Sequence, residues 1–176
     1  MEVLSRLAKV DLHLFAHVFR QGERRAVIPL AKALSHSGDG YLHLAIPVLL
    51  WQLQYRALNI FVALLMMAVV VERALYWSLK NSLKRRRPQD AVPGLRSLIS
   101  ASDQFSFPSG HSSGAFLLAT CTVLVFGGPA IALYLWAIGV ALSRVILGVH
   151  FPGDTIAGAA MGTGTALLCA QTLGVL

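Results

Sequence analysis

The chain has 176 residues, which is enough for one domain, and it carries a formal net charge of +7. Hydrophobic residues make up 56% of the sequence and charged residues only 13%, a composition that excludes an ordinary soluble globular domain. The two cysteines, Cys121 and Cys169, both lie inside apolar runs, so we expect packed thiols and no disulfide framework.

The first 36 residues are predicted to form an amphipathic helix in the membrane interface, with a basic face toward anionic lipid. Polar side chains recur there every three to four positions, and apolar side chains fill the opposite face. Residues 6–35 are not expected to span the membrane, because several charges would lie near its centre. These charges belong to Arg20, Glu23, Arg24 and Arg25.

Long apolar runs fill residues 37–176 and predict the architecture, since a transmembrane helix needs about 20 mostly apolar residues. We predict an all-α fold, a polytopic membrane helix bundle with about five transmembrane helices, or six, in a single domain over residues 1–176. In the last run, Gly158, Gly162 and Gly164 are expected to let helices approach closely. The runs occupy residues 41–53, 57–79, 113–126, 129–147 and 155–173.

Three polar blocks stand at the ends of these runs, between residues 80 and 154. Because the predicted helices alternate in direction, all three blocks are expected on one face of the membrane. Together they supply fixed positive charges, histidines and a glycine whose backbone N–H can act as a donor. The blocks read Lys80-x6-Arg87-Pro88, Pro108-Ser109-Gly110-His111 and Ser143-Arg144-x5-His150-x3-Asp154.

This inventory is suited to phosphoryl transfer through a histidine nucleophile, because anionic oxygens need preorganised donors. Asp154 follows His150 by four positions, in a turn that contains Pro152 and Gly153. We expect its carboxylate to accept a hydrogen bond from one imidazole nitrogen. The other nitrogen would then be unprotonated and free to attack phosphorus.

The three blocks, in this order, resemble the signature of the type 2 phosphatidic acid phosphatase family, whose superfamily includes bacterial acid phosphatases and vanadium haloperoxidases. The resemblance implies that His150 is the nucleophile, that Asp154 orients it, and that His111 protonates the leaving lipid oxygen and then activates water. It also implies a metal-independent reaction without a cofactor. The phosphate-binding residues that it implies are Lys80, Arg87, Ser109, Gly110 and Arg144.

The predicted function is hydrolysis of a lipid phosphate or diphosphate through a phosphohistidine intermediate. Phosphatidylglycerol phosphate, phosphatidic acid and polyprenyl (di)phosphates are the substrate types considered. Two alternatives stay open at this point: a vanadate-dependent peroxidase-type enzyme and a non-catalytic membrane scaffold that binds lipid. The expected partners are the lipid phosphate and the bilayer, with no nucleic acid and with an oligomeric state that the sequence does not specify.

Several polar residues outside the blocks have two interpretations. Residues 84–86 form either a basic patch on lipid or part of the site, and Glu72 and Arg73 are expected to form an interfacial ion pair. His36 and His43 are treated as interfacial unless they lie near the site. Residues 89–103 are expected to shape the headgroup pocket.

Two arguments about sidedness conflict. We expect an integral protein of the bacterial cytoplasmic membrane. The face that carries the blocks is rich in Lys and Arg, while the opposite face has only Arg56, and this bias favours a cytoplasmic site. The family resemblance favours an extracytoplasmic site.

Overall fold

The computed structural model describes residues 2–22 and 24–176, and every regular element within these ranges is a helix. Glu23, one of the predicted interfacial charges, and the side chains of residues 2–5 and 7 lie outside the described residues. The elements are α1 Glu2–Gly22, α2 Val27–Ser37, α3 Tyr41–Gln52, α4 Leu58–Leu83, α5 Pro88–Ala91, α6 Gly110–Phe126, the 3₁₀ helix η1 Gly128–Ala132, α7 Leu133–Ile146 and α8 Pro152–Thr172.

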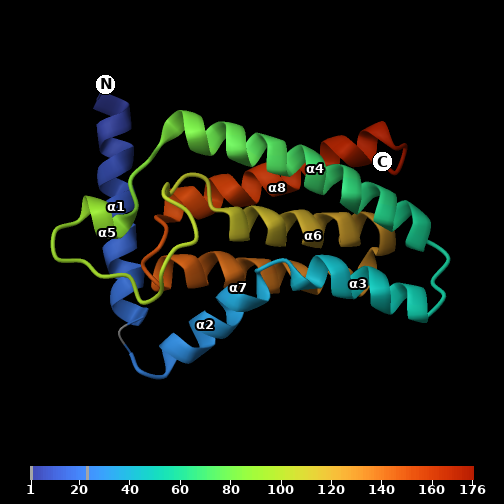
Figure 1. Cartoon of the computed structure of the whole chain (residues 1–176), viewed down its shortest axis with the longest axis horizontal. Coiled ribbons are helices and arrows are strands. Elements are labelled where there is room, and N and C mark those ends of the chain that lie inside the picture. Colours follow the sequence, from blue (N-terminus) through green and yellow to red (C-terminus); the bar gives the residue numbers. More distant parts are fainter. Residues whose placement is uncertain (1, 23) are drawn as a thin grey trace.

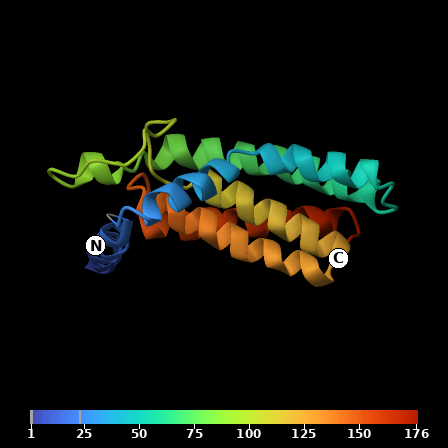
Figure 2. The same ribbon diagram turned by 90° about the horizontal axis from the view of Figure 1, so that it is seen from below.

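Helix α6 lies at the centre of a bundle and packs against α4, α7 and α8 (Figures 1 and 2). Its approach to α8 is close because α8 presents glycine there. A Cβ on Gly158 would lie 2.4 Å from the Ser109 carbonyl oxygen, and one on Gly162 would lie 2.1 Å from that of Ser113. The predicted role of small residues is confirmed at these two positions, whereas a Cβ on Gly164 would meet open space.

The distribution of apolar side chains fits a bundle surrounded by lipid. Phe61, Leu64 and Leu118 are fully buried between helices, yet Leu44 and Leu135 are each 74% exposed on outer surfaces. Large exposed apolar surfaces of this kind are uncommon on soluble monomers and mark contact with a membrane or a partner.

Two helical stretches among the described residues are long and apolar enough to cross a membrane, Leu58–Ala91 and Gly128–Ile146. Tyr41–Gln52 and Gly110–Phe126 are apolar but shorter. The predicted all-α bundle with helices of membrane-spanning length is therefore confirmed within the described residues, while the number of five or six spans stays a prediction.

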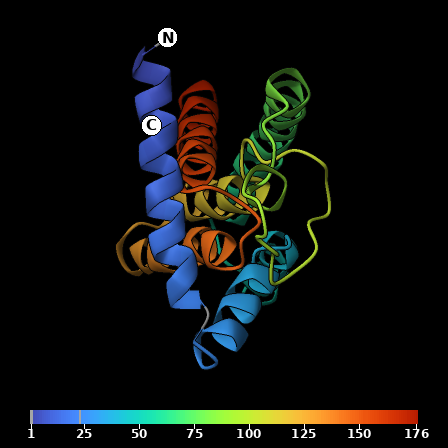
Figure 3. The ribbon, with the colours of Figure 1, turned by 90° about the vertical axis from the view of Figure 1, so that its left-hand side faces the viewer.

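Helix α1 crosses the end of the bundle at which α6 and α8 begin (Figures 1 and 3). Asp11 fixes it there: its carboxylate accepts hydrogen bonds from Arg85 at 2.5 Å and from the Gly153 N–H at 2.7 Å. Phe15, which is 1% exposed, packs edge-on against Phe151 with 5.3 Å between ring centroids. The N-terminal helix is thus tied to the end of the bundle that carries the polar blocks.

The stretch predicted as one interfacial segment, residues 1–36, contains two helices. Helix α2 turns away from α1 and packs along α7 (Figure 1). It is joined to α3 through residues 38–40, where Gly40 has a φ of +101°, a conformation that favours glycine. This turn places Asp39 beside the start of α6.

Candidate active site

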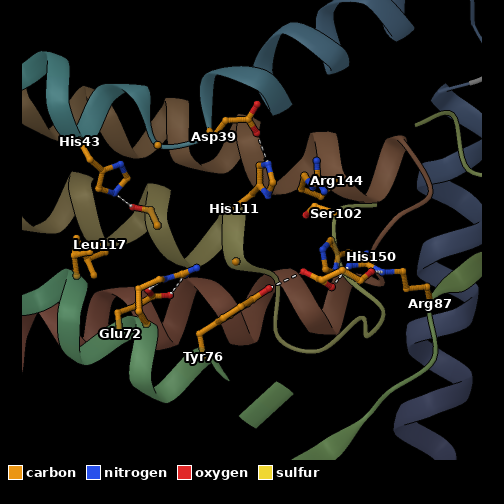
Figure 4. A pocket seen from close by; sticks show the side chains of 17 residues that line it. Asp39, His43, Glu72, Tyr76, Arg87, Ser102, His111, Leu117, Arg144 and His150 are labelled. Carbon is orange, nitrogen blue, oxygen red and sulfur yellow. Dashed lines mark hydrogen bonds and ion pairs between the residues drawn. The ribbon is translucent and has the colours of Figure 1, made fainter. Parts of the chain in front are cut away.

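A cavity of about 630 Å³ lies between α3, α4 and α6, and it extends to the loop that precedes α6 and the turn that precedes α8 (Figure 4). Helices α4 and α7 end here, and α6 and α8 begin here, so the topology gathers residues from all three sequence blocks. The predicted site residues that line the cavity are Arg87, Gly110, His111, Arg144 and His150. The other predicted residues, Lys80, Ser109 and Asp154, do not line it, but Lys80 contacts the lining residue Asp103 and Asp154 lies beside His150.

His150 occupies the turn between α7 and α8 and is 2% exposed. Its Nδ1 lies 3.7 Å from Asp154 Oδ2, which is an electrostatic contact longer than a normal hydrogen bond. The Ser106 hydroxyl lies beside both groups, 3.5 Å from His150 Nδ1, and donates to Asp154 Oδ2 at 2.5 Å. The carboxylate therefore stands on the expected side of the ring, with a serine hydroxyl in close contact.

Asp154 is held by donors from separate parts of the chain. Besides Ser106, the backbone N–H of Phe151 donates to Oδ2 at 2.8 Å, and Arg85 donates to Oδ1 at 2.7 Å. A buried carboxylate with this many donors is ionised and fixed in orientation. Arg85 is thus part of the support of the site, and it does not belong to a lipid-facing basic patch.

The electrostatics of the site keep His150 neutral. Burial and the positive charges of Arg87 and Arg144 lower the pKa of His150, Asp154 raises it, and the net result is a pKa of about 4. The imidazole is therefore uncharged at neutral pH, with one nitrogen free of a proton. Since Nδ1 faces Asp154 and Ser106, Nε2 is the nitrogen left for a ligand.

Asp103, in the loop before α6, organises two of the predicted cations. It accepts hydrogen bonds from Lys80 Nζ at 2.9 Å, Arg87 Nη2 at 2.5 Å and the Tyr76 hydroxyl at 2.8 Å. Burial alone would raise the pKa of Asp103, but the hydrogen bonds from Lys80 and Tyr76 outweigh it and hold that pKa at about 2. The carboxylate is therefore ionised and fixes the positions of both cations.

The guanidinium of Arg144 has a hydrogen-bonding group without a partner in the described part of the chain. Its side chain is 5% exposed, and its Nη1 donates to the Ser35 hydroxyl at 2.5 Å. Its Nε is buried with no hydrogen-bond partner among the described residues. An unpaired buried donor on a guanidinium that lines the cavity is suited to an anionic ligand.

His111, at the start of α6, forms a second pair with a carboxylate. Its Nε2 lies 2.7 Å from Asp39 Oδ1 (Figure 4). The other oxygen of Asp39 lies 2.7 Å from His36 Nδ1. Burial raises the pKa of Asp39, but hydrogen bonds from His111 and His36 lower it more, so the carboxylate is ionised at neutral pH. Asp39 thus fixes the orientation of the His111 ring.

Ser109 and Gly110 are placed differently from each other. The Ser109 hydroxyl is fully buried and caps α6, accepting from the Ser112 N–H at 3.5 Å and the Ser112 hydroxyl at 3.1 Å. Gly110 lines the cavity at the first turn of α6, where helical N–H groups have no partner within the helix. The N-terminus of α6, with Gly110, is therefore the better placed of the two to meet an anion.

Sequence reasoning gave no role in the chemistry to several residues that the structure brings to the site. Glu72 and Arg73 form the expected ion pair, at 2.5 and 2.6 Å, but the pair lines the cavity. His43 also lines it, and Asp103 lies in the loop that was expected to shape the pocket. At Asp39 the sequence signal was its position between His36 and His43. No local pattern in the sequence marked Ser106.

Comparison with known proteins places this arrangement in a family. Residues 56–175 match the PAP2 superfamily. The lipid A 4'-phosphatase of Bacteroides thetaiotaomicron is 31% identical over 88 residues, which are 48% of this chain and 39% of that protein. The decaprenylphosphoryl-5-phosphoribose phosphatase of Mycobacterium tuberculosis is 32% identical over 146 residues, 80% of this chain and 77% of that protein.

The fold agrees with the sequence match. The crystal structure of LpxE from Aquifex aeolicus superposes with a TM-score of 0.79 at 26% identity, covering 91% of this chain and 94% of that one. The region that matches the family, residues 56–175, contains all three polar blocks. The match to the lipid A 4'-phosphatase named above spans 39% of that protein's length. The match of residues 56–175 to the family, the mycobacterial relative that covers 80% of this chain and the shared fold agree with one another. The chain therefore belongs to the PAP2 superfamily.

Proposed function

We propose that the chain is a metal-independent membrane phosphatase that hydrolyses a lipid phosphate through a phosphohistidine on His150. The observation that carries the proposal is a buried, neutral His150 in the same cavity as the guanidinium groups of Arg87 and Arg144. A neutral imidazole is a nucleophile, and the two cations supply the charge that attracts and stabilises a phosphoryl group.

In the proposed first step, the phosphate lies against Arg87, Arg144 and the N-terminus of α6. His150 Nε2 attacks phosphorus, and the bond between phosphorus and the lipid oxygen breaks. Burial and the charge of Arg144 lower the pKa of His111 to about 4 before phosphate binds, and the negative charges of Asp39 and of the bound phosphate favour its protonated form. In the complex, protonated His111 gives a proton to that oxygen, so that the lipid leaves as an alcohol. Asp154 stabilises the positive charge that develops on the His150 ring.

In the second step, water attacks the phosphohistidine. His111, now deprotonated, accepts a proton from this water, and the bond between nitrogen and phosphorus breaks. Inorganic phosphate leaves, and both His150 and His111 return to their starting protonation states. Asp39 is proposed to hold His111 in one orientation in both steps, since a positioned acid and base contributes about 10²- to 10⁴-fold to rate.

A lipid substrate is supported by the walls of the cavity and by the relatives. Val69 and Leu117 line it beside the charged groups, so an apolar tail can lie next to a bound phosphate. The relatives are named as phosphatases of lipid A and of decaprenylphosphoryl-5-phosphoribose, which are phosphorylated lipids. These names favour hydrolysis over a peroxidase or a scaffold.

The direct test is a panel of lipid phosphates presented to the purified protein in detergent. We expect inorganic phosphate from at least one of phosphatidylglycerol phosphate, phosphatidic acid and a polyprenyl phosphate. The matched control is Ser78→Ala, a polar change on the exposed face of α4 that should leave turnover intact. Halide oxidation with vanadate and peroxide, without phosphate release, would replace this proposal by the peroxidase.

We also propose the bacterial cytoplasmic membrane as the location, with a slight preference for a cytoplasmic site from the charge bias. Gln89→Cys, in the exposed part of α5, can be labelled in intact cells after replacement of both native cysteines. Ready modification by a membrane-impermeant reagent would place the site outside.

A further inference from the structure

The cavity has a second polar end, away from His150. In Figure 4, His150 and Arg87 lie at one end of the pocket, and His43, Glu72 and Leu117 lie at the other. Glu72 precedes Lys80 by eight residues on α4, which corresponds to about 12 Å along the helix axis. The Tyr76 ring lies between the two ends, because the Arg73 guanidinium and Lys80 Nζ lie 4.3 and 4.4 Å from its centroid. The second end therefore adjoins the phosphate end and faces the part of a bound molecule next to the phosphate.

The centre of this second end is an ion pair. Arg73 Nε lies 2.5 Å from Glu72 Oε2, and Arg73 Nη2 lies 2.6 Å from Glu72 Oε1. Glu72 is 2% exposed, and the Arg73 guanidinium stacks on the Tyr76 ring at 4.3 Å. The Arg73 side chain is 42% exposed, so Glu72 is the buried member of the pair. A carboxylate is costly to bury in an apolar bundle, so a buried Glu72 whose ion pair lines a cavity indicates a function.

The chemistry of this end differs from that of the phosphate end. The pair is neutral as a whole, so it offers no net attraction to a second anion. Arg73 still has N–H groups beyond the two that bond Glu72, and each carboxylate oxygen of Glu72 can accept more than one hydrogen bond. His43 adds a ring whose Nε2 contacts the Gly114 carbonyl at 3.1 Å and whose Nδ1 is buried without a partner among the described residues.

We infer that His43, Glu72 and Arg73 form a subsite for a neutral, oxygen-bearing unit between the phosphate and the lipid tail, such as a glyceryl ester or a sugar. This inference rests on the proposed function and adds a substrate class to it. Hydroxyl and carbonyl groups satisfy the donors and acceptors of the pair. A bare alkyl or polyprenyl phosphate places hydrocarbon there and leaves those groups unpaired, which selects against it.

The test compares two substrates with one chain of the same length, a monoacylglycerol phosphate and the corresponding alkyl phosphate, in the same detergent micelles. They differ only in the glyceryl ester unit. One charge-assisted hydrogen bond corresponds to a preference in kcat/KM of about 10- to 150-fold for the acylglycerol phosphate. The ratio of the two kcat/KM values does not depend on how much of a preparation is active.

The variant removes both charges, Glu72→Met together with Arg73→Met, because removing Arg73 alone would leave the Glu72 carboxylate buried and unpaired. We expect the ratio to fall toward one, while Ser78→Ala on the exposed face of the same helix keeps the wild-type ratio. His43→Leu, which retains the ion pair, is a second variant and should lower the ratio in part.

A wild-type ratio near one, or one that favours the alkyl phosphate, overturns the subsite and leaves the phosphatase activity standing. A high ratio that the double variant and His43→Leu both retain overturns it as well. If the wild type releases phosphate from neither substrate nor from an aryl phosphate, the proposed function fails, and the subsite fails with it.

Discussion

Replacement of Asp39 by asparagine tests a residue that lies outside the three sequence blocks. Asp39→Asn keeps the shape of the side chain and removes the charge that lies 2.7 Å from His111 Nε2. A hydrogen bond to a charged group contributes about 1.5–3 kcal/mol. Because 36% of the Asp39 side chain is exposed, solvent screening favours the lower part of that range. At 1.36 kcal/mol per factor of ten, kcat should fall about 10- to 30-fold on a lipid phosphate.

The assay measures kcat for a lipid phosphate and for an activated aryl phosphate with the same preparation. If Asp39 acts through His111 as the acid, the loss should be smaller for the aryl phosphate, whose leaving oxygen needs little protonation. Asp90→Asn, an exposed aspartate on α5, is the matched control, and His36→Ala removes the other partner of Asp39. Wild-type kcat in Asp39→Asn, or equal losses on both substrates, would refute this reasoning.

Three further predictions concern packing, metal and pH. Gly162→Ala forces a Cβ to within 2.1 Å of a backbone oxygen of α6, so the free energy of unfolding in detergent should drop by about 1–3 kcal/mol. Gly164→Ala, whose Cβ would meet open space, should not lower it. EDTA should leave phosphate release unchanged, and loss of activity that magnesium restores would count against the histidine mechanism. Because the pKa of His150 is about 4 in place of 6.5, the nucleophile stays neutral at mildly acidic pH. In a plot of kcat/KM against pH, corrected for substrate ionisation, the acidic limb should therefore have its midpoint well below pH 6.5. A midpoint at or above pH 6.5 would contradict this assignment.

Local spacing in the sequence predicted the helical bundle and the convergence of the polar blocks, because each depends on short-range patterns. Apolar runs predict helices, and alternating helices bring their ends together. Gly158 and Gly162 predicted the close approach of α8 to α6 for the same reason. The contact between His150 and Asp154 followed from a four-residue separation, although its 3.7 Å distance and the adjoining Ser106 did not.

The partners that arrange the site were not predictable in this way. Asp39 meets His111 across 72 positions, and Asp103 meets Lys80 across 23. Both lie in loops whose course depends on how the helices pack, and a lone aspartate in a loop has no periodic pattern to mark it. The capping role of the Ser109 hydroxyl was also missed, because a serine before a helix is equally suited to a cap and to an anion.

The most direct test of the proposed function is identification of the phosphorylated residue. The protein is mixed with a lipid phosphate labelled in its phosphoryl group, quenched in alkali, under which phosphohistidine is stable, and digested for mass spectrometry. The account predicts label on the peptide that contains His150, and no label and no turnover in a His150→Ala variant that still elutes as folded protein. Label on any other residue, or turnover retained by His150→Ala, would contradict it.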